Sequence, residues 1–436
     1  MSTATDIAAS LPAELAGISG QKAEKPLRIA ILSYRSTPHV GGQGIYIDYL
    51  SRALLERGHS VDVLSGPPYP ECDRRVNIVK IPSLDLYAQP HNGHFALRPK
   101  HLLSAADTSE YFSHLSGRFS EPLTFSSRVA RHFRNHDVDY DVILDNQSLG
   151  QGLLNPTVRK TPFVGVIHHP ITRDLRLALE AEDNWKKRWL VRRWYSFHKE
   201  QIRVARRLPF LITPSRATKA DIISEFGIRP EQLHVIPLGV DQDTFRPDPA
   251  VQRKQSEIIT TASADVPLKG LIYLLRALAQ VRKVHPEVSL RVIGKLRKGP
   301  TANELKKLGL EDAVTFESNL SRADLARAFC SASVSVSPSL YEGFGLPCAE
   351  AMSCATPVIT SDGGALPEVA GDAGIIVPKA DDVALAQALS EFFSLSADDR
   401  AAMGQKAYQR AVSHFNWASI APLYEAVFQE AIASQC

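Results

Sequence analysis

The chain has 436 residues, of which 44% are hydrophobic and 22% charged, and its formal net charge is +3. This length allows two or three domains with a large buried core, and so small a charge gives no sign of nucleic-acid binding. Five cysteines without paired spacing indicate free thiols in a reducing compartment and make no zinc motif. No apolar run has the length of a membrane span, and residues 1–25 lack a signal-peptide layout. We therefore expect residues 1–25 to be a disordered tail and the protein to be cytoplasmic.

The first half of the chain opens with a strand–helix–strand pattern. Residues 27–33 read as a buried strand, residues 38–44 as a glycine loop, residues 45–57 as a helix, and residues 59–64 as the next strand. This unit predicts a parallel sheet with right-handed crossovers. The loop is not a GxGxxG fingerprint, which argues against an NAD-dependent oxidoreductase. A GGxG loop either brings the backbone close to a polar ligand or makes a plain tight turn, and the sequence leaves both open.

Polar side chains follow two later strands of the same half. Residues 140–145 form a strand that ends in Asp145, and residues 161–169 form one that ends in His168 and His169. Ligands of open parallel sheets bind beyond the carboxyl ends of the strands. We therefore expect these three side chains and the glycine loop at one edge of the first sheet.

A basic, aromatic helical stretch occupies residues 176–207. It contains Trp185, Trp189 and Trp194, and its lysines and arginines outnumber its acids. Basic residues interleaved with tryptophan are typical of an interfacial membrane helix. The alternative is a solvated basic helix whose aromatic rings lie in the core, since Trp185 and Trp189 share one helix face.

The second half repeats the α/β pattern after a proline-rich linker. Strands are predicted at residues 258–262, 289–293, 314–316, 334–336, 358–360 and 375–377, with a striped helix at 271–284. The pattern predicts two Rossmann-like domains facing across a cleft, with boundaries at residues 26–240 and 241–412, and a final helix within 413–436. Lys269 lies on a loop after the first of these strands, and a basic loop with Lys295 and Lys298 follows the second.

The most informative stretch is residues 337–369. Glu342 and Glu350 lie eight residues apart, separated by a Gly-Phe-Gly-Leu-Pro turn between a strand and a helix. Pro347 suits the start of that helix, and we expect Glu350 in its first turn. A helix N-terminus with its N–H groups suits an anionic ligand.

With Gly364 and the Pro-Glu-Val segment at 367–369, this stretch resembles the C-terminal signature of retaining glycosyltransferases of GT-B family 4. The resemblance implies an N-terminal acceptor domain, a C-terminal nucleotide-sugar domain, and a last helix that returns to the first domain. It makes Glu342 catalytic, beside the transferred sugar. It also makes His168, rather than His169, the histidine that contacts this sugar.

The same resemblance assigns the remaining site residues. Lys269 would bind the diphosphate and Glu350 the ribose. Family members carry an Arg where this chain has Ala264, so Lys295 or Lys298 is a candidate for the second cation. Asp145 and His169 are candidates for acceptor contacts because of their place at the strand ends, not because of the resemblance. The other donor-binding residues implied are Gly42, Gly44, Gly345, Leu346, Gly364, Ala365 and Leu366.

The function implied is transfer of a monosaccharide from a nucleotide-diphosphate sugar, UDP favoured over GDP. The acceptor would be a glycan, a lipid-linked sugar or a small molecule, in cell-surface polysaccharide or glycoconjugate synthesis. No Asp-x-Asp motif lies in a suitable loop, and we expect neither a metal nor another cofactor. Membrane contact through residues 185–194 would be peripheral, on the inner face. A glycogen-synthase-like or sucrose-cleaving relative is a rival within the fold, and a non-catalytic GT-B binding protein is the alternative from another class.

Overall fold

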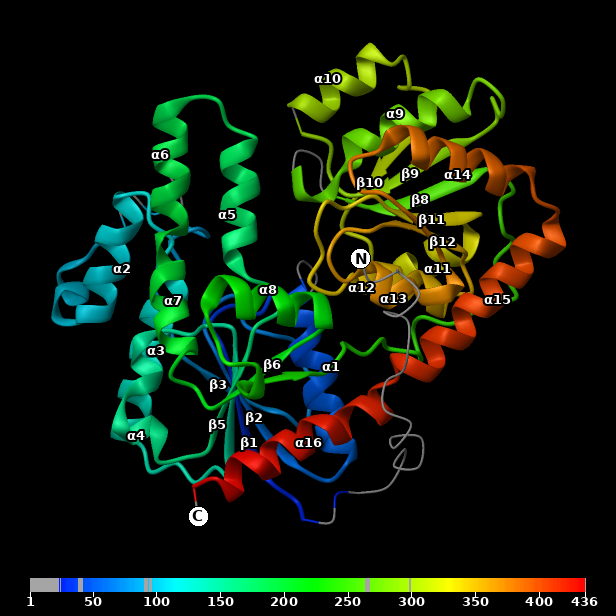
Figure 1. The fold of residues 1–436 in the computed structure, drawn as a ribbon. Coiled ribbons are helices and arrows are strands. Elements are labelled where there is room, and N and C mark those ends of the chain that lie inside the picture. Colours follow the sequence, from blue (N-terminus) through cyan, green and yellow to red (C-terminus); the bar gives the residue numbers. More distant parts are fainter. Residues whose placement is uncertain are drawn as a thin grey trace. The chain divides into compact units, whose positions relative to one another are not determined.

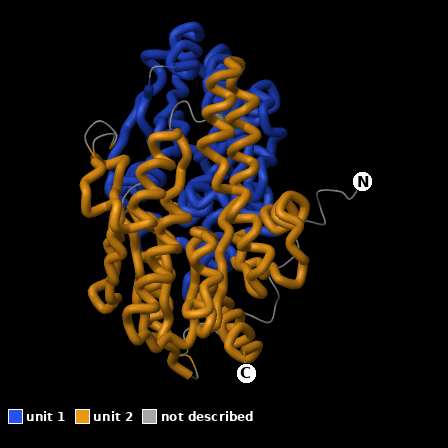
Figure 2. The backbone as a smooth tube through the Cα atoms, turned by 90° about the vertical axis from the view of Figure 1, so that its left-hand side faces the viewer, with its two compact units in different colours: residues 1–17, 215–217, 237–419 blue, residues 18–214, 218–236, 420–436 orange. Residues whose placement is uncertain are grey.

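The computed structural model describes residues 23, 25–37, 42–89, 93, 96–262, 267–297 and 299–435. The tail expected at residues 1–25 therefore lies almost wholly outside the described residues, as do Ala264 and Lys298. The chain forms two compact units, coloured separately in Figure 2. We call the unit of residues 237–419, with 215–217, the C-terminal unit. The other, made of described residues up to 214 with 218–236 and 420–435, is the N-terminal unit.

The N-terminal unit is built on a seven-stranded parallel sheet (Figure 1). Its strand order is β3-β2-β1-β4-β5-β6-β7, so the order reverses between β1 and β4. The strands are short and strongly apolar, as expected for a sheet covered on both faces. Their bounds are β1 Arg28–Ser33, β2 Ser60–Ser65, β3 Asn77–Lys80, β4 Val142–Asn146, β5 Phe163–Val166, β6 Phe210–Thr213 and β7 Leu233–Val235.

Helices cover both faces of this sheet. One face packs into a buried cluster that includes Phe125 and Val129 of α3, Val204 of α7 and Ile222 of α8. The helices of the unit are α1 Gly42–Glu56, η4 Pro99–Leu103, α2 Ala105–Leu115, α3 Glu121–Asn135, η5 Gln151–Leu154, α4 Pro156–Arg159, α5 Ile171–Glu180, α6 Trp185–Trp194, η6 Tyr195–Phe197, α7 His198–Ala205, α8 Arg216–Phe226 and η7 Pro230–Gln232.

The last helix, α16 (Trp417–Ala433), packs against the N-terminal unit from Ile420 onward. The Tyr46 hydroxyl of α1 donates to the Tyr424 hydroxyl at 3.1 Å. Glu425 accepts from both Arg57 and His59, which lie between α1 and β2. These contacts confirm the predicted return of the C-terminal helix to the first domain.

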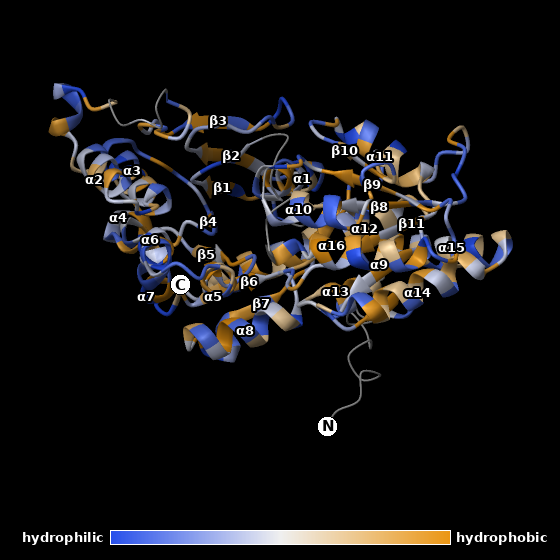
Figure 3. Cartoon of the chain, turned by 90° about the horizontal axis from the view of Figure 1, so that it is seen from above, coloured by the Kyte–Doolittle hydropathy of each residue, from blue (hydrophilic) through white to orange (hydrophobic). Residues whose placement is uncertain are grey.

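The C-terminal unit carries a six-stranded parallel sheet in the order β10-β9-β8-β11-β12-β13. Here the order reverses between β8 and β11. In Figure 3, strands such as β1, β2 and β9 carry the hydrophobic colour, as do parts of helices such as α16, and this fits strands buried on both faces. The bounds are β8 Glu257–Thr261, β9 Ser289–Ile293, β10 Val314–Glu317, β11 Val334–Ser337, β12 Val358–Ser361 and β13 Ile375–Val377.

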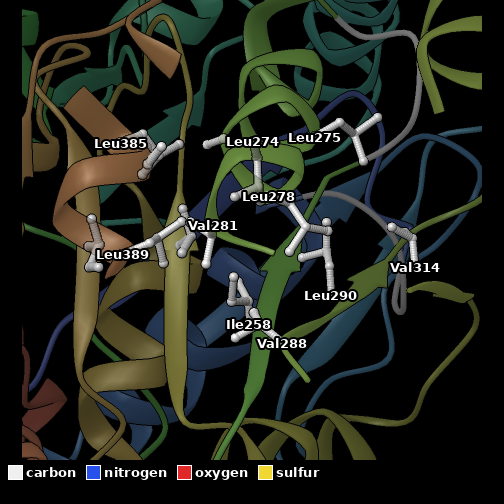
Figure 4. Packing of buried hydrophobic residues seen from close by; sticks show 14 of the residues in the cluster. Ile258, Leu274, Leu275, Leu278, Val281, Val288, Leu290, Val314, Leu385 and Leu389 are labelled. Carbon is white, nitrogen blue, oxygen red and sulfur yellow. The ribbon is translucent and has the colours of Figure 1, made fainter. Parts of the chain in front are cut away.

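Two buried clusters lie on the two faces of this second sheet. On one face, Leu274 and Leu278 of α9 meet Leu290 of β9 and Leu389 of α14 (Figure 4). On the other face, α11, α12, α13 and α15 pack around Phe329. The helices are η8 Pro267–Lys269, α9 Leu271–Val281, α10 Pro300–Lys307, α11 Arg322–Ser331, α12 Leu346–Ser353, α13 Leu366–Ala370, η9 Gly371–Ala373, α14 Asp382–Ser394 and α15 Ala397–His414.

Several predicted element boundaries were wrong. Helix α1 begins at Gly42 and so includes the end of the expected glycine loop. Strand β5 ends at Val166 rather than at the histidines. The reason is local, because the His168 N–H donates to the side chain of Gln147 and not to a neighbouring strand.

Candidate active site

Three charged or hydroxyl side chains meet beyond the carboxyl ends of the strands of the C-terminal unit. The Lys269 ammonium donates to Glu342 Oε1 at 2.6 Å, and the Ser339 hydroxyl donates to the same oxygen at 2.8 Å. Lys269 lies on the loop after β8, and Ser339 and Glu342 lie on the loop after β11. These two strands flank the point where the strand order reverses, the usual ligand site of such sheets. The structure thus brings together the predicted catalytic carboxylate and the predicted phosphate-binding cation.

Close backbone contacts hold the loop that carries Glu342. A Cβ atom on Gly270 would lie 2.1 Å from the Pro338 carbonyl oxygen, and one on Gly364 would lie 2.3 Å from the Glu342 carbonyl oxygen. Both glycines have φ near +60°, a conformation that favours glycine. The Ala365 N–H donates to the Glu342 carbonyl at 2.9 Å. The predicted donor residues Gly364 and Ala365 therefore support the backbone of Glu342.

The turn before α12 brings two more predicted residues into the same region. Gly345 has φ +97° and precedes the first helical residue, Leu346. Its Cβ would lie 2.7 Å from the side chain of Leu366, so only glycine lets the loops pack this closely. Pro347 lies in the first turn of α12, as the sequence predicts.

Glu350 is almost fully buried and is held by an arginine that the sequence analysis missed. Because α12 begins at Leu346, Glu350 lies in the second turn rather than the expected first. Arg322 of α11 donates to Glu350 Oε1 at 2.8 Å, and its guanidinium lies 4.5 Å from the ring centre of Phe245. Burial raises the pKa of Glu350, and Arg322 opposes that rise.

Lys295 lies on the loop after β9, the strand next to β8. Its side chain is exposed. Its position beside the Lys269 loop is compatible with the predicted second phosphate contact. The other candidate, Lys298, lies outside the described residues, so the role of this loop stays a prediction.

In the N-terminal unit, His168 is held by an amide and an aromatic ring. His168 Nε2 lies 2.6 Å from Asn146 Oδ1, and the ring of Tyr46 packs edge-on against the imidazole, with centroids 4.7 Å apart. Burial is the main cause that lowers the pKa of His168 to about 3, so the imidazole is neutral near pH 7. A neutral histidine bonded to an amide oxygen suits sugar binding better than proton abstraction.

The two predicted acceptor residues differ in their exposure. Asp145 is fully buried, and its carboxylate accepts from the Ser148 hydroxyl and from the Leu149 N–H. Burial also raises the pKa of Asp145 to about 6. His169 is a third exposed, and its Nε2 lies 2.7 Å from Asp174 Oδ2. Both assignments stay predictions, and exposure favours His169 because Asp145 is occupied by the turn after β4.

The glycines of the first loop lie at the start of α1. Gly42 is exposed, whereas Gly44 is buried. A Cβ on Gly44 would lie 2.2 Å from the Thr37 carbonyl oxygen, so this position accepts only glycine. Contact of Gly42 and Gly44 with the donor stays a prediction.

Residues that support the site gave weaker signals in the sequence. Ser339 stands three residues before Glu342, a spacing that suits a local side-chain hydrogen bond. Asn146 follows directly on a predicted strand. Arg322 carries no local signal, since it reaches Glu350 only through packing of α11 on α12. Within the described residues, no three histidine, cysteine or acidic side chains gather as a metal site.

The family models match nearly the whole chain. The model "Glycosyl transferases group 1" matches residues 242–410, and the model "Glycosyltransferase Family 4" matches residues 40–244. The chain is 46% identical over 412 residues to MMP alpha-(1->4)-mannosyltransferase of Mycolicibacterium hassiacum. That alignment covers 93% of this chain and 99% of the relative.

Solved structures share the fold at low sequence identity. Sucrose-phosphate synthase of Thermosynechococcus elongatus matches with a TM-score of 0.68 at 22% identity, covering 94% of this chain and all of that one. Anabaena HepE in complex with UDP and glucose matches with a TM-score of 0.66 at 18% identity, covering 93% and 100%. The two parallel-sheet units, the returning helix and the family matches agree. The chain belongs to the family 4 glycosyltransferases of the GT-B fold and uses a nucleotide sugar.

Proposed function

We propose that this enzyme transfers a hexose, mannose in the first instance, with retention of the α configuration and without a metal ion. The single observation that carries the proposal is the Lys269–Glu342–Ser339 cluster at the strand-order reversal of the C-terminal unit. The choice of mannose and of an α linkage rests on the 46% identical relative, whose name states an α-(1→4)-mannosyltransferase.

Lys269 would stabilise the leaving nucleotide diphosphate. A lysine ammonium has three N–H donors, so Lys269 can keep its bond to Glu342 and still donate to a phosphate oxygen. Charge that develops on the leaving group is stabilised most by donors that are already oriented. The contacts of Glu342 with Ser339 and Lys269 provide that orientation before substrate binds.

The chemical step would be an attack on the face from which the diphosphate leaves. The bond between the anomeric carbon and the phosphate oxygen breaks, and the acceptor hydroxyl oxygen bonds to that carbon on the same face. The hydroxyl proton passes to the departing phosphate oxygen. Glu342 would stabilise positive charge at the anomeric carbon, and neutral His168 would hold the sugar.

The nucleotide is the part of the donor that needs a direct test. UDP is the prediction from the sequence, and HepE was solved with UDP, but at 18% identity that likeness supports only the fold. We propose UDP as the first nucleotide to test, beside GDP carrying the same sugar. Glu350 and Arg322 would lie on the ribose side in either case.

We also propose a glycan acceptor and a peripheral membrane contact through α6. Trp185 and Trp189 are 72% and 57% exposed, so the alternative in which these rings lie in the core is wrong. Exposed tryptophans between basic residues favour an anionic lipid surface. Sedimentation with phosphatidylglycerol vesicles should carry down the wild type, and a Trp185→Ser/Trp189→Ser double variant should stay in the supernatant. No sedimentation of the wild type would contradict this contact.

No described helix is both long and apolar enough to cross a bilayer.

The test of the proposed function is turnover with defined donors. Purified protein is mixed with UDP- or GDP-linked glucose or mannose and with α-(1→4)-linked mannosides, with and without a chelator. We expect nucleotide release from one donor, unaffected by the chelator, and NMR should show an α-linked product. A β-linked product would contradict retention. No turnover with any donor, in a protein that still binds a nucleotide, would favour the non-catalytic binding protein.

A further inference from the structure

A pocket of about 230 Å³ lies in the N-terminal unit beyond the carboxyl ends of β1, β4 and β5. Tyr34 follows β1, Gln147 follows β4 and His169 follows β5, and all three line it. Other lining residues come from segments outside the sheet, namely Phe119 before α3 and Trp194, Tyr195 and Phe197 at the end of α6 and in η6. The pocket therefore lies where open parallel sheets bind ligands.

Part of the lining is a cluster of aromatic rings. The rings of Phe119 and Trp194 are stacked, with centroids 5.3 Å apart and planes 23° apart, and Phe197 packs edge-on against Phe119. The Phe119 N–H also donates to the Trp194 carbonyl at 3.3 Å, which ties the two segments together. Trp194 is still 37% exposed, so part of its ring is open to a ligand.

Another part of the lining is polar and is held by hydrogen bonds. His169 Nε2 lies 2.7 Å from Asp174 Oδ2, and the Gln147 side chain donates to the His169 carbonyl at 3.0 Å. Buried Gln201 in turn donates to the Gln147 carbonyl at 3.2 Å. These bonds tie the ends of β4 and β5 to α7. The His169–Asp174 pair that lines the pocket is therefore held in one position.

The lining favours a neutral, hydroxylated ring over an anion. Among the described residues that line the pocket there is one carboxylate, Asp174, and no lysine or arginine. A phosphate or nucleotide would therefore meet no lysine or arginine among these described residues. The volume is below the roughly 300–1,000 Å³ of pockets for drug-sized ligands, so it suits a single ring. Aromatic faces beside a carboxylate and an imidazole match the apolar face and the hydroxyls of a hexopyranose.

We propose that this pocket binds the terminal hexopyranose of the acceptor glycan, with its apolar face on the Phe119–Trp194 stack and its hydroxyls toward His169 and Asp174. This inference rests on the proposed function for the nature of the acceptor. It adds Phe119, Trp194 and Asp174 as specificity-determining residues that the sequence motifs did not indicate.

The experiment measures acceptor binding without requiring turnover. Saturation-transfer NMR with methyl α-D-mannopyranoside and α-(1→4)-mannotriose compares the wild type with Trp194→Ala and Asp174→Asn. Phe112→Ala is the matched control, since Phe112 is 54% exposed in the same unit and does not line the pocket. We expect both pocket variants to weaken mannoside binding about tenfold and the control to bind as the wild type does. Asp174→Asn keeps the test informative if Trp194→Ala fails to fold, as judged by thermal unfolding.

Kinetics separate this inference from the proposed function. If transfer occurs, the pocket variants should raise the acceptor KM about tenfold and leave the donor KM and donor hydrolysis unchanged. Wild-type acceptor affinity and KM in both folded pocket variants would overturn the pocket assignment, whatever the enzyme transfers. An inactive wild type that binds mannosides in this pocket would overturn the proposed transfer and leave the pocket assignment supported.

Discussion

The carboxyl edges of the two sheets are built from different chemistry. In the C-terminal unit the edge carries charged pairs, Lys269 with Glu342 and Arg322 with Glu350. In the N-terminal unit the corresponding edge carries neutral His168, bonded to Asn146, beside an aromatic pocket. Both edges lie where the strand order reverses.

This difference matches the two substrates of a sugar transfer. A nucleotide diphosphate brings concentrated negative charge, which oriented cations stabilise. A sugar acceptor is neutral, and rings and single hydrogen bonds recognise it. On the proposed function, the same α/β layout supports two kinds of site, and what differs is the set of side chains on the loops after the strands. The following variants test how strictly the two roles are divided.

The largest effect is expected from removing the charge of Glu342. Glu342→Gln keeps the size of the side chain but cannot stabilise a positive anomeric carbon, and we expect kcat to fall about 10²–10³-fold. Nucleotide binding should change little. The exposed Glu311 provides the control, Glu311→Gln, which should keep wild-type kcat. A kcat within twofold of the wild type for Glu342→Gln would remove Glu342 from the chemical step.

Substitution of Arg322 should mainly lower the free energy of unfolding. Arg322→Met leaves the buried Glu350 carboxylate without its partner, and we expect a loss of about 2 kcal/mol, below the roughly 3–5 kcal/mol for fully buried pairs because Arg322 is partly exposed. The substitution should raise the pKa of Glu350 further. A carboxyl group with a raised pKa in the folded state stabilises at low pH and loses that contribution as pH rises.

The loss of unfolding free energy in Arg322→Met, relative to the wild type, should therefore be larger at about pH 8 than at about pH 5. Urea unfolding at both pH values measures it. A deficit that is equal at both, or larger at low pH, would show that Arg322 does not act through the charge of Glu350.

The sequence indicated residues of the charged edge and His168 of the neutral edge, but it did not indicate the aromatic pocket. Glu342, Lys269 and Gly364 lie within short segments that resemble a family signature, so the resemblance points to them from the sequence alone. The aromatic pocket draws Tyr34, Phe119 and Trp194 from three separated segments, and no local pattern relates them. Arg322 was not predicted for the same reason, since its contact with Glu350 depends on how two helices pack. Periodicity could not decide whether Trp185 and Trp189 are exposed or buried either, because a shared helix face can point inward or outward.

Two glycine variants distinguish the cost of backbone strain from the cost of displacing the loop that carries Glu342. Gly364 and Gly309 both have φ near +60°. A Cβ atom on Gly364 would lie 2.3 Å from the Glu342 carbonyl oxygen, whereas a Cβ atom on Gly309 would have no atom within 4 Å. Gly309→Ala should cost about 1 kcal/mol from strain alone. Gly364→Ala should cost more and lower kcat/KM about tenfold, a loss of ~1.4 kcal/mol.

Thermal unfolding and steady-state kinetics measure both glycine variants. Equal losses of stability with unchanged kcat/KM in both would mean that the Gly364 contact does not position Glu342.

The effect on kcat/KM expected at His168 is as small as that expected at Gly364. His168→Gln should lower kcat/KM about tenfold, the scale of one hydrogen bond to the sugar. Because the pKa of His168 is lowered to about 3, the loss should be the same at every pH between about 5.5 and 8. A pH–rate profile of wild type and variant decides this. A break near pH 6.5 that disappears in the variant would make His168 a proton-transferring group.

The central claim is that the charged edge of the C-terminal unit binds the donor's diphosphate. Thermal unfolding with UDP and GDP tests it in wild type, Lys269→Ala and Trp194→Ala. A nucleotide at 100 times its dissociation constant stabilises a protein by about 2.7 kcal/mol, and a tenfold weaker site gains only about 1.4 kcal/mol at the same concentration. We predict this reduced stabilisation in Lys269→Ala and the full stabilisation in Trp194→Ala. Full stabilisation of Lys269→Ala by the nucleotide that stabilises the wild type would contradict the claim.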